Sequence, residues 1–324
     1  MIGEAEILDR REVGRSMALV ERTAGSLAEW LNGHRDVFET HMTDAGALLL
    51  RGFDLASVED FHAVARDLCG DICTDNSEHT TVSADGTVQT PVPYAADRLL
   101  LWHNENSFND EWPLRIAFCC VQPAEHGGET PIVDSCAVLR AIDPAFRDEL
   151  AEKGVAYIRN FASGLGLSWQ TVFRTDNRTT VARYCHEHGI AADWSAKGHL
   201  RTVAVRPAIV PHPVTGELSL FAQPQHWHPA CLDPDVRVTL EHSATGVGFP
   251  RDCTFGDGSP IGDEEMRHLL DVYRRHQVVF PWRPGDLLVL DNVLWAHGRN
   301  PYAGRRTILV AMGSLYAYAD NPAS

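Results

Sequence analysis

The order of apolar and polar residues predicts a chain of short strands with helices between them. From about residue 99, apolar runs of strand length alternate with turn residues. The expected strands are at 114–123, 127–134, 155–161, 277–282 and 286–297. The N-terminal third shows helix-like periodicity over 16–31, an apolar strand at 46–53 and a helix at 57–70, where Ser57 and Asp60 resemble a capping box.

Three further helices are expected between the strands. The segment 143–154 has a capping residue, a proline at the first helical position and a closing glycine. The segment 178–189 is shorter. In 262–276, acids stand at the start, bases at the end, and apolar residues recur at helical spacing. Many short strands with helices at their flanks predict a mainly β protein with a double-stranded β-helix (jelly-roll, cupin-like) core, rather than a doubly wound sheet.

Composition restricts the class of protein. The chain is 44% hydrophobic and 22% charged, as in globular proteins with a sizeable core. It contains no apolar run of the roughly 20 residues that a membrane span needs, and its start is polar and acidic, so we expect a cytoplasmic protein. A formal net charge of -16 argues against nucleic acid or an anionic membrane as a partner. The eight cysteines form no CxxC pairs, which favours reduced thiols.

The segment "LLLWHNENSF" places two potential metal ligands, His103 and Glu105, in an apolar run. Side chains at i and i+2 of a strand point to one face, so both could converge on one ion. A carboxylate buried there without a partner would be costly. A third ligand from a distant strand would complete the two-histidine, one-carboxylate set of non-haem Fe(II) oxygenases.

Other histidines compete for this role. His186 and His188 lie at the end of an expected helix, where the helix dipole explains a histidine. His226 and His228 precede a proline and have no carboxylate beside them, and His212 stands between two prolines. A structural role is favoured for the pairs His186/His188 and His226/His228.

The candidate third ligand is His297, at the end of the run 286–297. If this run and the run 305–312 form a hairpin, His297 lies near Arg305 and Arg306. A metal-chelating dicarboxylate would then bind the metal at one end and a guanidinium at the other.

Three motifs in register resemble the taurine dioxygenase-like (TauD/TfdA) family of Fe(II)- and 2-oxoglutarate-dependent oxygenases. They are "WHNENSF" at 102–108, "GGETPIVD" at 127–134 and "PGDLLVLDNVLWAHGRNPYAGRRTILVAM" at 284–312. The likeness runs from about residue 45 to the C-terminus. It is nearest to the branch of syringomycin-type aspartate hydroxylases and clavaminate synthase-like enzymes.

The resemblance implies a role for five residues. His103, Glu105 and His297 would be the Fe(II) ligands, and Thr130 and Arg306 would bind 2-oxoglutarate. The family's arginine is the second of an Arg-Arg pair followed by two apolar residues, which points to Arg306 although a threonine follows it here. The family's taurine-binding arginine has no counterpart, because Leu309 and Val310 stand there, so taurine is not the expected substrate.

The resemblance also implies one dioxygenase domain over 1–324. It would have an N-terminal helical and strand region at about 1–95 and a jelly-roll core at about 96–324, with a helical and loop insert at about 140–275. The implied reaction uses O2 and 2-oxoglutarate, releases succinate and CO2, and hydroxylates an unactivated C–H bond. The implied substrate is a small molecule, an amino acid or its derivative in a natural-product pathway, free or presented by a carrier protein.

A carboxylate at position 105 favours hydroxylation over halogenation, because related halogenases have a small residue there. Two alternatives remain open from the residues themselves. One is a cupin-like metalloenzyme that does not use 2-oxoglutarate, and the other is a catalytically silent binding protein on the same fold.

Overall fold

Two sheets packed face to face form the centre of the molecule. The computed structural model describes residues 6–8, 14–23, 25–74, 79–161, 166–243 and 248–318. The larger sheet has the order β1-β2-β3-β17-β7-β20-β5-β4. These strands are β1 (Glu6–Leu8), β2 (Met17–Glu21), β3 (Ala47–Arg51), β17 (Leu287–Asp291), β7 (Glu111–Gln122), β20 (Thr307–Ala317), β5 (Gln89–Thr90) and β4 (Thr80–Thr81). The smaller sheet consists of β16 (Gln277–Val278), β9 (Ile132–Asp134), β18 (Trp295–Arg299) and β6 (Leu100–His103).

The central strands of the larger sheet are apolar on both faces because both faces are covered. On β7, Ile116 and Phe118 pack in the cluster between the two sheets, together with Ile132 and Trp295 of the smaller sheet. Ala117, between them in sequence, packs in a separate cluster on the outer face. This alternation follows from the two-residue period of a strand and accounts for the continuous apolar run.

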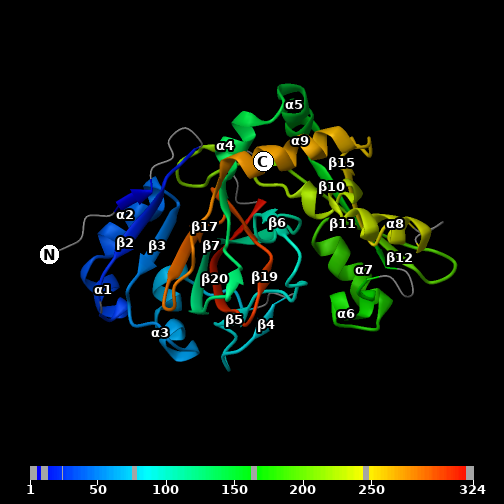
Figure 1. The fold of residues 1–324 in the computed structure, drawn as a ribbon. Coiled ribbons are helices and arrows are strands. Elements are labelled where there is room, and N and C mark those ends of the chain that lie inside the picture. Colours follow the sequence, from blue (N-terminus) through cyan, green and yellow to red (C-terminus); the bar gives the residue numbers. More distant parts are fainter. Residues whose placement is uncertain are drawn as a thin grey trace.

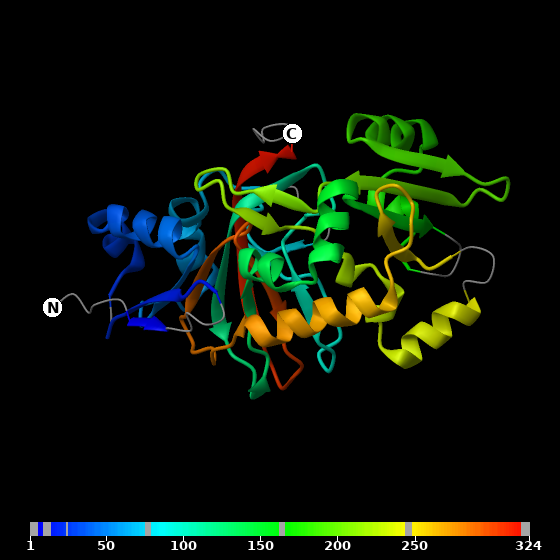
Figure 2. The same ribbon diagram turned by 90° about the horizontal axis from the view of Figure 1, so that it is seen from above.

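Helices cover the two outer faces of this sandwich. The outer face of the larger sheet packs on α1 (Leu27–Gly33), α2 (Arg35–Asp44) and α3 (Val58–Cys69). The outer face of the smaller sheet packs on α4 (Ser135–Ala141), α5 (Pro144–Lys153) and α9 (Asp263–His276). Figure 1 shows α1–α3 on one side of β17, β7 and β20, and Figure 2 shows α9 running along the molecule. The arrangement is the expected jelly-roll core with flanking helices.

A third sheet lies beside the sandwich, with the order β11-β12-β10-β15. Its strands are β10 (Val155–Phe161), β11 (Ile190–Trp194), β12 (Leu200–Arg206) and β15 (Arg251–Phe255). α6 (Trp169–Phe173) and α7 (Arg178–Glu187) pack against this sheet, and α8 (Pro234–Ser243) lies with them on the side of the molecule opposite α1–α3 (Figure 1). Short elements complete the chain: β8 (His126–Gly127), β13 (Ile209–Pro211), β14 (Leu218–Leu220), β19 (Tyr302–Ala303) and the 3-10 turns η1 (Pro224–His226) and η2 (Pro229–Cys231).

Local sequence signals determine the helix ends. At α5, the Asp143 side chain accepts hydrogen bonds from the backbone N–H groups of Ala145 (2.9 Å) and Phe146 (3.2 Å), and Gly154 ends the helix at φ 66°. At α3, Ser57 caps the first turn through the backbone N–H of Asp60. The helices predicted at 57–70, 143–154, 178–189 and 262–276 are therefore confirmed.

Two expectations are wrong. The helix-like segment 16–31 begins with strand β2, and α1 starts only at Leu27. Met17 to Val20 are all buried, and Ala18 to Glu21 pair in parallel with β3. A strand buried on both faces loses the alternation that would identify it. The runs 286–297 and 305–312 do not form a hairpin. A turn after β17 carries the chain into the smaller sheet, so β18 and β20 belong to different sheets.

No helix in the described ranges is long and apolar enough to cross a lipid bilayer. All eight cysteines are free thiols, and only Cys231 is not fully buried.

Candidate metal centre

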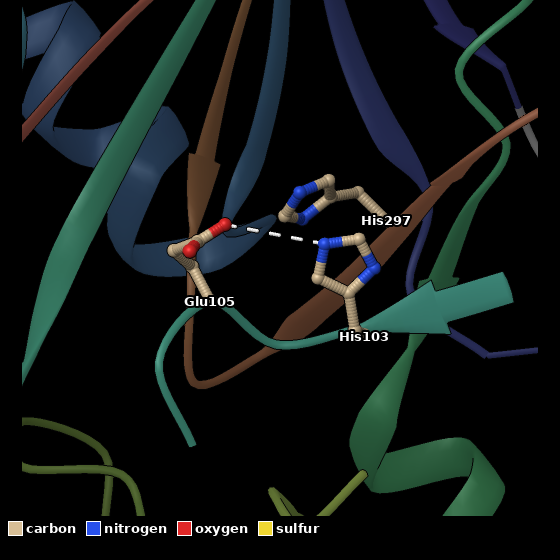
Figure 3. A group of neighbouring side chains, drawn as sticks. All are labelled: His103, Glu105 and His297. Atoms are coloured by element: carbon tan, nitrogen blue, oxygen red, sulfur yellow. Dashed lines mark ion pairs between the residues drawn. The ribbon is translucent and has the colours of Figure 1, made fainter. Parts of the chain in front are cut away.

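His103 and His297 are opposite each other on neighbouring strands. β6 and β18 pair antiparallel with His103 in register with His297, so their side chains leave the same face of the smaller sheet. The two ring centroids are 4.4 Å apart (Figure 3). On the other face of β6, Trp102 stacks on Tyr273 of α9 at 5.6 Å, which fixes the strand against the helix. The sequence predicted that these two histidines share one site, but it did not predict that their strands pair.

Glu105 comes from a turn and not from a strand. β6 ends at His103, and Asn106 has φ 60°, so the regular i, i+2 geometry expected for 103–105 is wrong. The turn nevertheless brings the carboxylate to the histidines: Glu105 Oε2 lies 3.9 Å from His103 Nε2, the pair joined by the dashed line in Figure 3.

The side chain of Asn292 fixes the backbone of Glu105. Its Oδ1 accepts from the Glu105 N–H at 2.6 Å, and its Nδ2 donates to the Glu105 carbonyl at 3.0 Å and to the Pro113 carbonyl at 2.9 Å. Asn292 is fully buried in the turn between β17 and β18. The turn that leads to His297 therefore also positions the turn that carries Glu105.

The histidines at the centre present lone pairs. His103 Nδ1 lies 2.9 Å from the Leu101 carbonyl, which can only accept, so Nδ1 carries the proton and Nε2 is available as a ligand. Burial lowers the pKa of His297 well below its ordinary value, and nearby His103 and His79 add to this. Burial lowers the pKa of His226, whose ring is 4.6 Å from that of His103, to about 3. Neutral imidazoles are the form that binds a metal.

The donor set fits Fe(II). One nitrogen from each histidine and one Glu105 oxygen all lie within 4.8 Å of one another, close enough for one ion to contact all three. No other group of three such side chains with this spacing occurs among the described residues. Two imidazoles and one carboxylate on one side of an ion leave the opposite positions open, as in non-haem iron oxygenases.

Thr130 and Arg306 meet beside the smaller sheet. Arg306 donates through Nε to the Gly128 carbonyl at 2.8 Å and through Nη2 to Thr130 Oγ1 at 3.4 Å. The indole N–H of Trp282 also donates to Thr130 Oγ1, at 3.1 Å. Arg305 is exposed, whereas Arg306 is partly buried, and burial lowers the pKa of Arg306 to about 10. A carboxylate bound here would offset that desolvation.

The two glycines before Thr130 allow this approach. Gly127 has φ 68°, and a Cβ there would lie 2.2 Å from the Pro301 carbonyl oxygen. At Gly128, with φ 75°, a Cβ would come within 3.1 Å of the Arg306 side chain. The motif "GGET" is therefore explained by a close contact with the loop that carries the arginine.

The competing histidines have other partners. His188 lies 2.9 Å from Asp110, His212 lies 2.9 Å from Asp291, and His228 lies 3.0 Å from the Ile261 carbonyl. His186 is in the last turn of α7. His226 bonds to the Leu101 carbonyl at 2.7 Å, so it supports the backbone next to His103.

Asn292 and His79 lie at the site but were not predicted from the sequence. Asn292 lies within the motif at 284–312, and no role was predicted for it. A polar residue inside an apolar run is nevertheless typical of a buried hydrogen-bonding role. His79 precedes β4, far in sequence from the motifs, and nothing local pointed to it.

Comparisons with known proteins show the family to which the chain belongs. Residues 14–312 match the family model described as taurine catabolism dioxygenase TauD, TfdA family. The chain is 34% identical to dapdiamide synthesis protein DdaC of Enterobacter agglomerans over 299 residues, covering 92% of this chain and 90% of that protein. It is 27% identical to a clavaminate synthase-like protein of Arabidopsis thaliana over 284 residues, covering 83% and 82%.

Solved structures show the same fold. AAD-2 in complex with Mn(II) and N-oxalylglycine matches at a TM-score of 0.50 with 15% identity, over 92% of both chains. A putative alpha-ketoglutarate-dependent taurine dioxygenase from Burkholderia xenovorans matches at 0.50 with 17% identity, over 91% of this chain and 88% of the other. The resemblance stated from the motifs is confirmed: the chain belongs to the TauD/TfdA family and is a non-haem Fe(II)- and 2-oxoglutarate-dependent oxygenase that uses O2.

Proposed function

We propose that this oxygenase hydroxylates an unactivated C–H bond of an amino acid or an amino-acid-derived molecule in a natural-product pathway, the substrate being free or presented by a carrier protein. The observation that carries the proposal is the compact donor set of His103, Glu105 and His297. A relative 34% identical is named for dapdiamide synthesis, which supports the pathway class. The proposal treats 1–324 as one domain.

In this proposal His103, Glu105 and His297 hold Fe(II), and Thr130 and Arg306 hold the distal carboxylate of 2-oxoglutarate. Fe(II) held by these residues would supply O2 activation coupled to decarboxylation of 2-oxoglutarate. The chain's own residues position the reactants and keep water out. Glu105 would hold the metal through its carboxylate, and because related halogenases have a small residue at this position, the carboxylate supports hydroxylation.

Arg306 and Thr130 bind the carboxylate in complementary ways. The guanidinium offers a charge-assisted contact, and its Nε bond to the Gly128 carbonyl fixes its plane. Thr130 Oγ1 already accepts from Trp282 and Arg306, so its own hydroxyl hydrogen is directed elsewhere and can be donated to a carboxylate oxygen.

To test the roles of these residues, the visible absorption spectrum of the protein is recorded without O2 while Fe(II) and then 2-oxoglutarate are added. We expect a weak charge-transfer band only when both are present, and loss of the band in His297→Ala and Arg306→Ala. Arg305→Ala is the matched control, because Arg305 is the exposed neighbour, and it should keep the band. Bound iron without a band in the wild type would contradict the chelate, and a band retained in Arg306→Ala would contradict that residue's role.

The reaction is tested by incubating the loaded enzyme with amino acids and their N-acyl derivatives. A product heavier by one oxygen atom, formed with an equal amount of succinate, supports hydroxylation. A product lighter than the substrate by two hydrogen atoms would show that the reaction is desaturation and not hydroxylation.

A further inference from the structure

A cavity of about 300 Å³ lies between the turn that carries Glu105 and the third sheet with α6 and α7. Asn106, which lines it, directly follows Glu105. Trp227, which also lines it, directly follows His226, whose ring contacts His103. Two residues of the lining are therefore chain neighbours of residues at the metal centre, and we call the side of the cavity that they form its inner wall.

The inner wall is an aromatic cluster with a guanidinium against it. Phe108 lies 6.4 Å from Tyr157 and 5.4 Å from Trp227, between ring centroids. The guanidinium carbon of Arg159 lies 5.3 Å from the Phe108 centroid and 5.2 Å from the Trp227 centroid. These contacts hold a half-buried positive charge at a defined place in the wall.

The charge of the cavity differs from that of the whole chain. Arg159 and Arg174 line it, and no aspartate or glutamate is among the described residues that do so. The chain as a whole carries a net charge of -16. The remaining polar lining consists of asparagine, threonine and tyrosine side chains, which can bond amide and hydroxyl groups. The cavity is therefore complementary to an anion with a polar, amide-containing body.

Backbone strain is concentrated at the same cavity. Among the described residues, only Asn106, Arg174 and Ser314 are non-glycine residues with positive φ, and two of these three line it. Arg174 ends α6 at φ 49° and ψ 36°, a position where glycine is the usual residue. A long charged side chain in a strained cap position indicates that the side chain is needed there.

We propose that this cavity is the substrate subsite, and that Arg159 and Arg174 in its lining bind a carboxylate group of the substrate. This rests on the proposed function. The substrate class is a carboxylic acid with amide or hydroxyl groups. Its reacting carbon lies toward Glu105, and its carboxylate is held away from the metal.

The test is isothermal titration calorimetry on the protein loaded with Mn(II) and 2-oxoglutarate without O2. The probes are N-acetyl-L-alanine and N-acetylglycyl-L-alanine, each compared with its carboxamide. A charge-assisted hydrogen bond is worth about 1.5–3 kcal/mol, so at least one acid should bind at least tenfold more tightly than its amide. Acids that bind no better than their amides, or no binding by either acid, would overturn the proposal.

Two variants test the arginines. Arg159→Gln should abolish the discrimination between acid and amide. Arg174→Gly should weaken acid binding by about three- to tenfold while unfolding at no lower urea concentration than the wild type, because glycine removes the strain. Arg183→Gln is the control, since Arg183 is exposed on α7 and outside the lining. Equal discrimination in wild type and both variants would show that the arginines do not bind the carboxylate.

The two experiments distinguish an error in the proposed subsite from an error in the proposed function. If the charge-transfer band forms but no acid is preferred, only the subsite is wrong. If an acid is preferred through Arg159 but no band forms, the subsite remains as a carboxylate site, and the assigned residues of the metal centre are wrong.

Discussion

The backbone of Glu105 is held by Asn292, a residue outside the candidate donor set. The Asn292 side chain hydrogen-bonds to the backbone N–H and carbonyl of Glu105 and to the Pro113 carbonyl. Its amide therefore fixes the backbone from which the Glu105 side chain extends. Asn104 Nδ2 in turn donates to the Asn292 carbonyl at 2.6 Å. Partners of this kind fix the direction of a metal ligand.

Replacing Asn292 by alanine should weaken metal binding about 10–100-fold, because such supporting contacts have effects of this size. The measurement is the Kd for Mn(II) by calorimetry, together with urea unfolding. Ser219→Ala is the matched control. Ser219 is fully buried and its hydroxyl donates to the Val293 carbonyl in the same turn, but it does not contact Glu105. If both variants lose stability and metal affinity alike, Asn292 acts only through the fold.

At the level of residues, the candidate ligands could be predicted from residue type and motif but not from geometry. His103 and His297 could be named because their motifs are specific. The position of Glu105 could not be derived, because it depends on the positive φ of Asn106 and on Asn292, which is 187 residues away in sequence. The choice of Arg306 over Arg305 agrees with the burial of Arg306 against Thr130.

At the level of elements, one buried ion pair joins β3 to the turn before β17. Arg51 donates through Nε and Nη2 to the two oxygens of Asp286, at 2.8 and 2.7 Å, and these hydrogen bonds raise the pKa of Arg51. Asp286 is fully buried and also accepts from the Arg283 N–H at 2.7 Å. The pair holds the N-terminal strands to the jelly-roll strands.

Replacing Asp286 by alanine should lower the free energy of unfolding by about 3–5 kcal/mol, because a buried guanidinium is left without its partner. Urea unfolding measures this loss. Arg283→Ala, which removes an exposed pair between the same turn and Glu21 of the neighbouring strand β2, should lower it by less than about 1 kcal/mol. Similar losses of unfolding free energy in the two variants would show that burial does not increase the contribution of the Arg51–Asp286 pair to stability.

Local signals predicted the helices well and the strand pairing poorly. Caps and amphipathic spacing lie within one segment, as at Asp143 and Gly154, so the sequence contains them. The assignment of 17–21 to a strand depends on β3, and the separation of β18 from β20 depends on which sheet each strand joins. The region expected as a helical and loop insert also contains the sheet β11-β12-β10-β15. Such long-range pairings are decided by tertiary packing.

At the level of the whole molecule, the candidate ligands come from both sheets. The candidate metal ligands belong to β6, the turn after it and β18 in the smaller sheet, whereas Arg306 immediately precedes β20 in the larger sheet. A dicarboxylate that contacts the metal and Arg306 therefore links the two sheets. Because ligands that bind only the folded state stabilise it by mass action, unfolding reports this link without any turnover.

We expect Mn(II) and 2-oxoglutarate, each at about 100 times its Kd, to raise the free energy of unfolding by about 2.7 kcal/mol per ligand. The effect of 2-oxoglutarate should require the metal, since the proposed chelate uses both. Urea unfolding without O2 measures the two increments. His297→Ala should lose both, Arg306→Gln should lose only the 2-oxoglutarate increment, and Arg305→Gln should keep both. An undiminished 2-oxoglutarate increment in Arg306→Gln would mean that the co-substrate does not link the two sheets through this arginine.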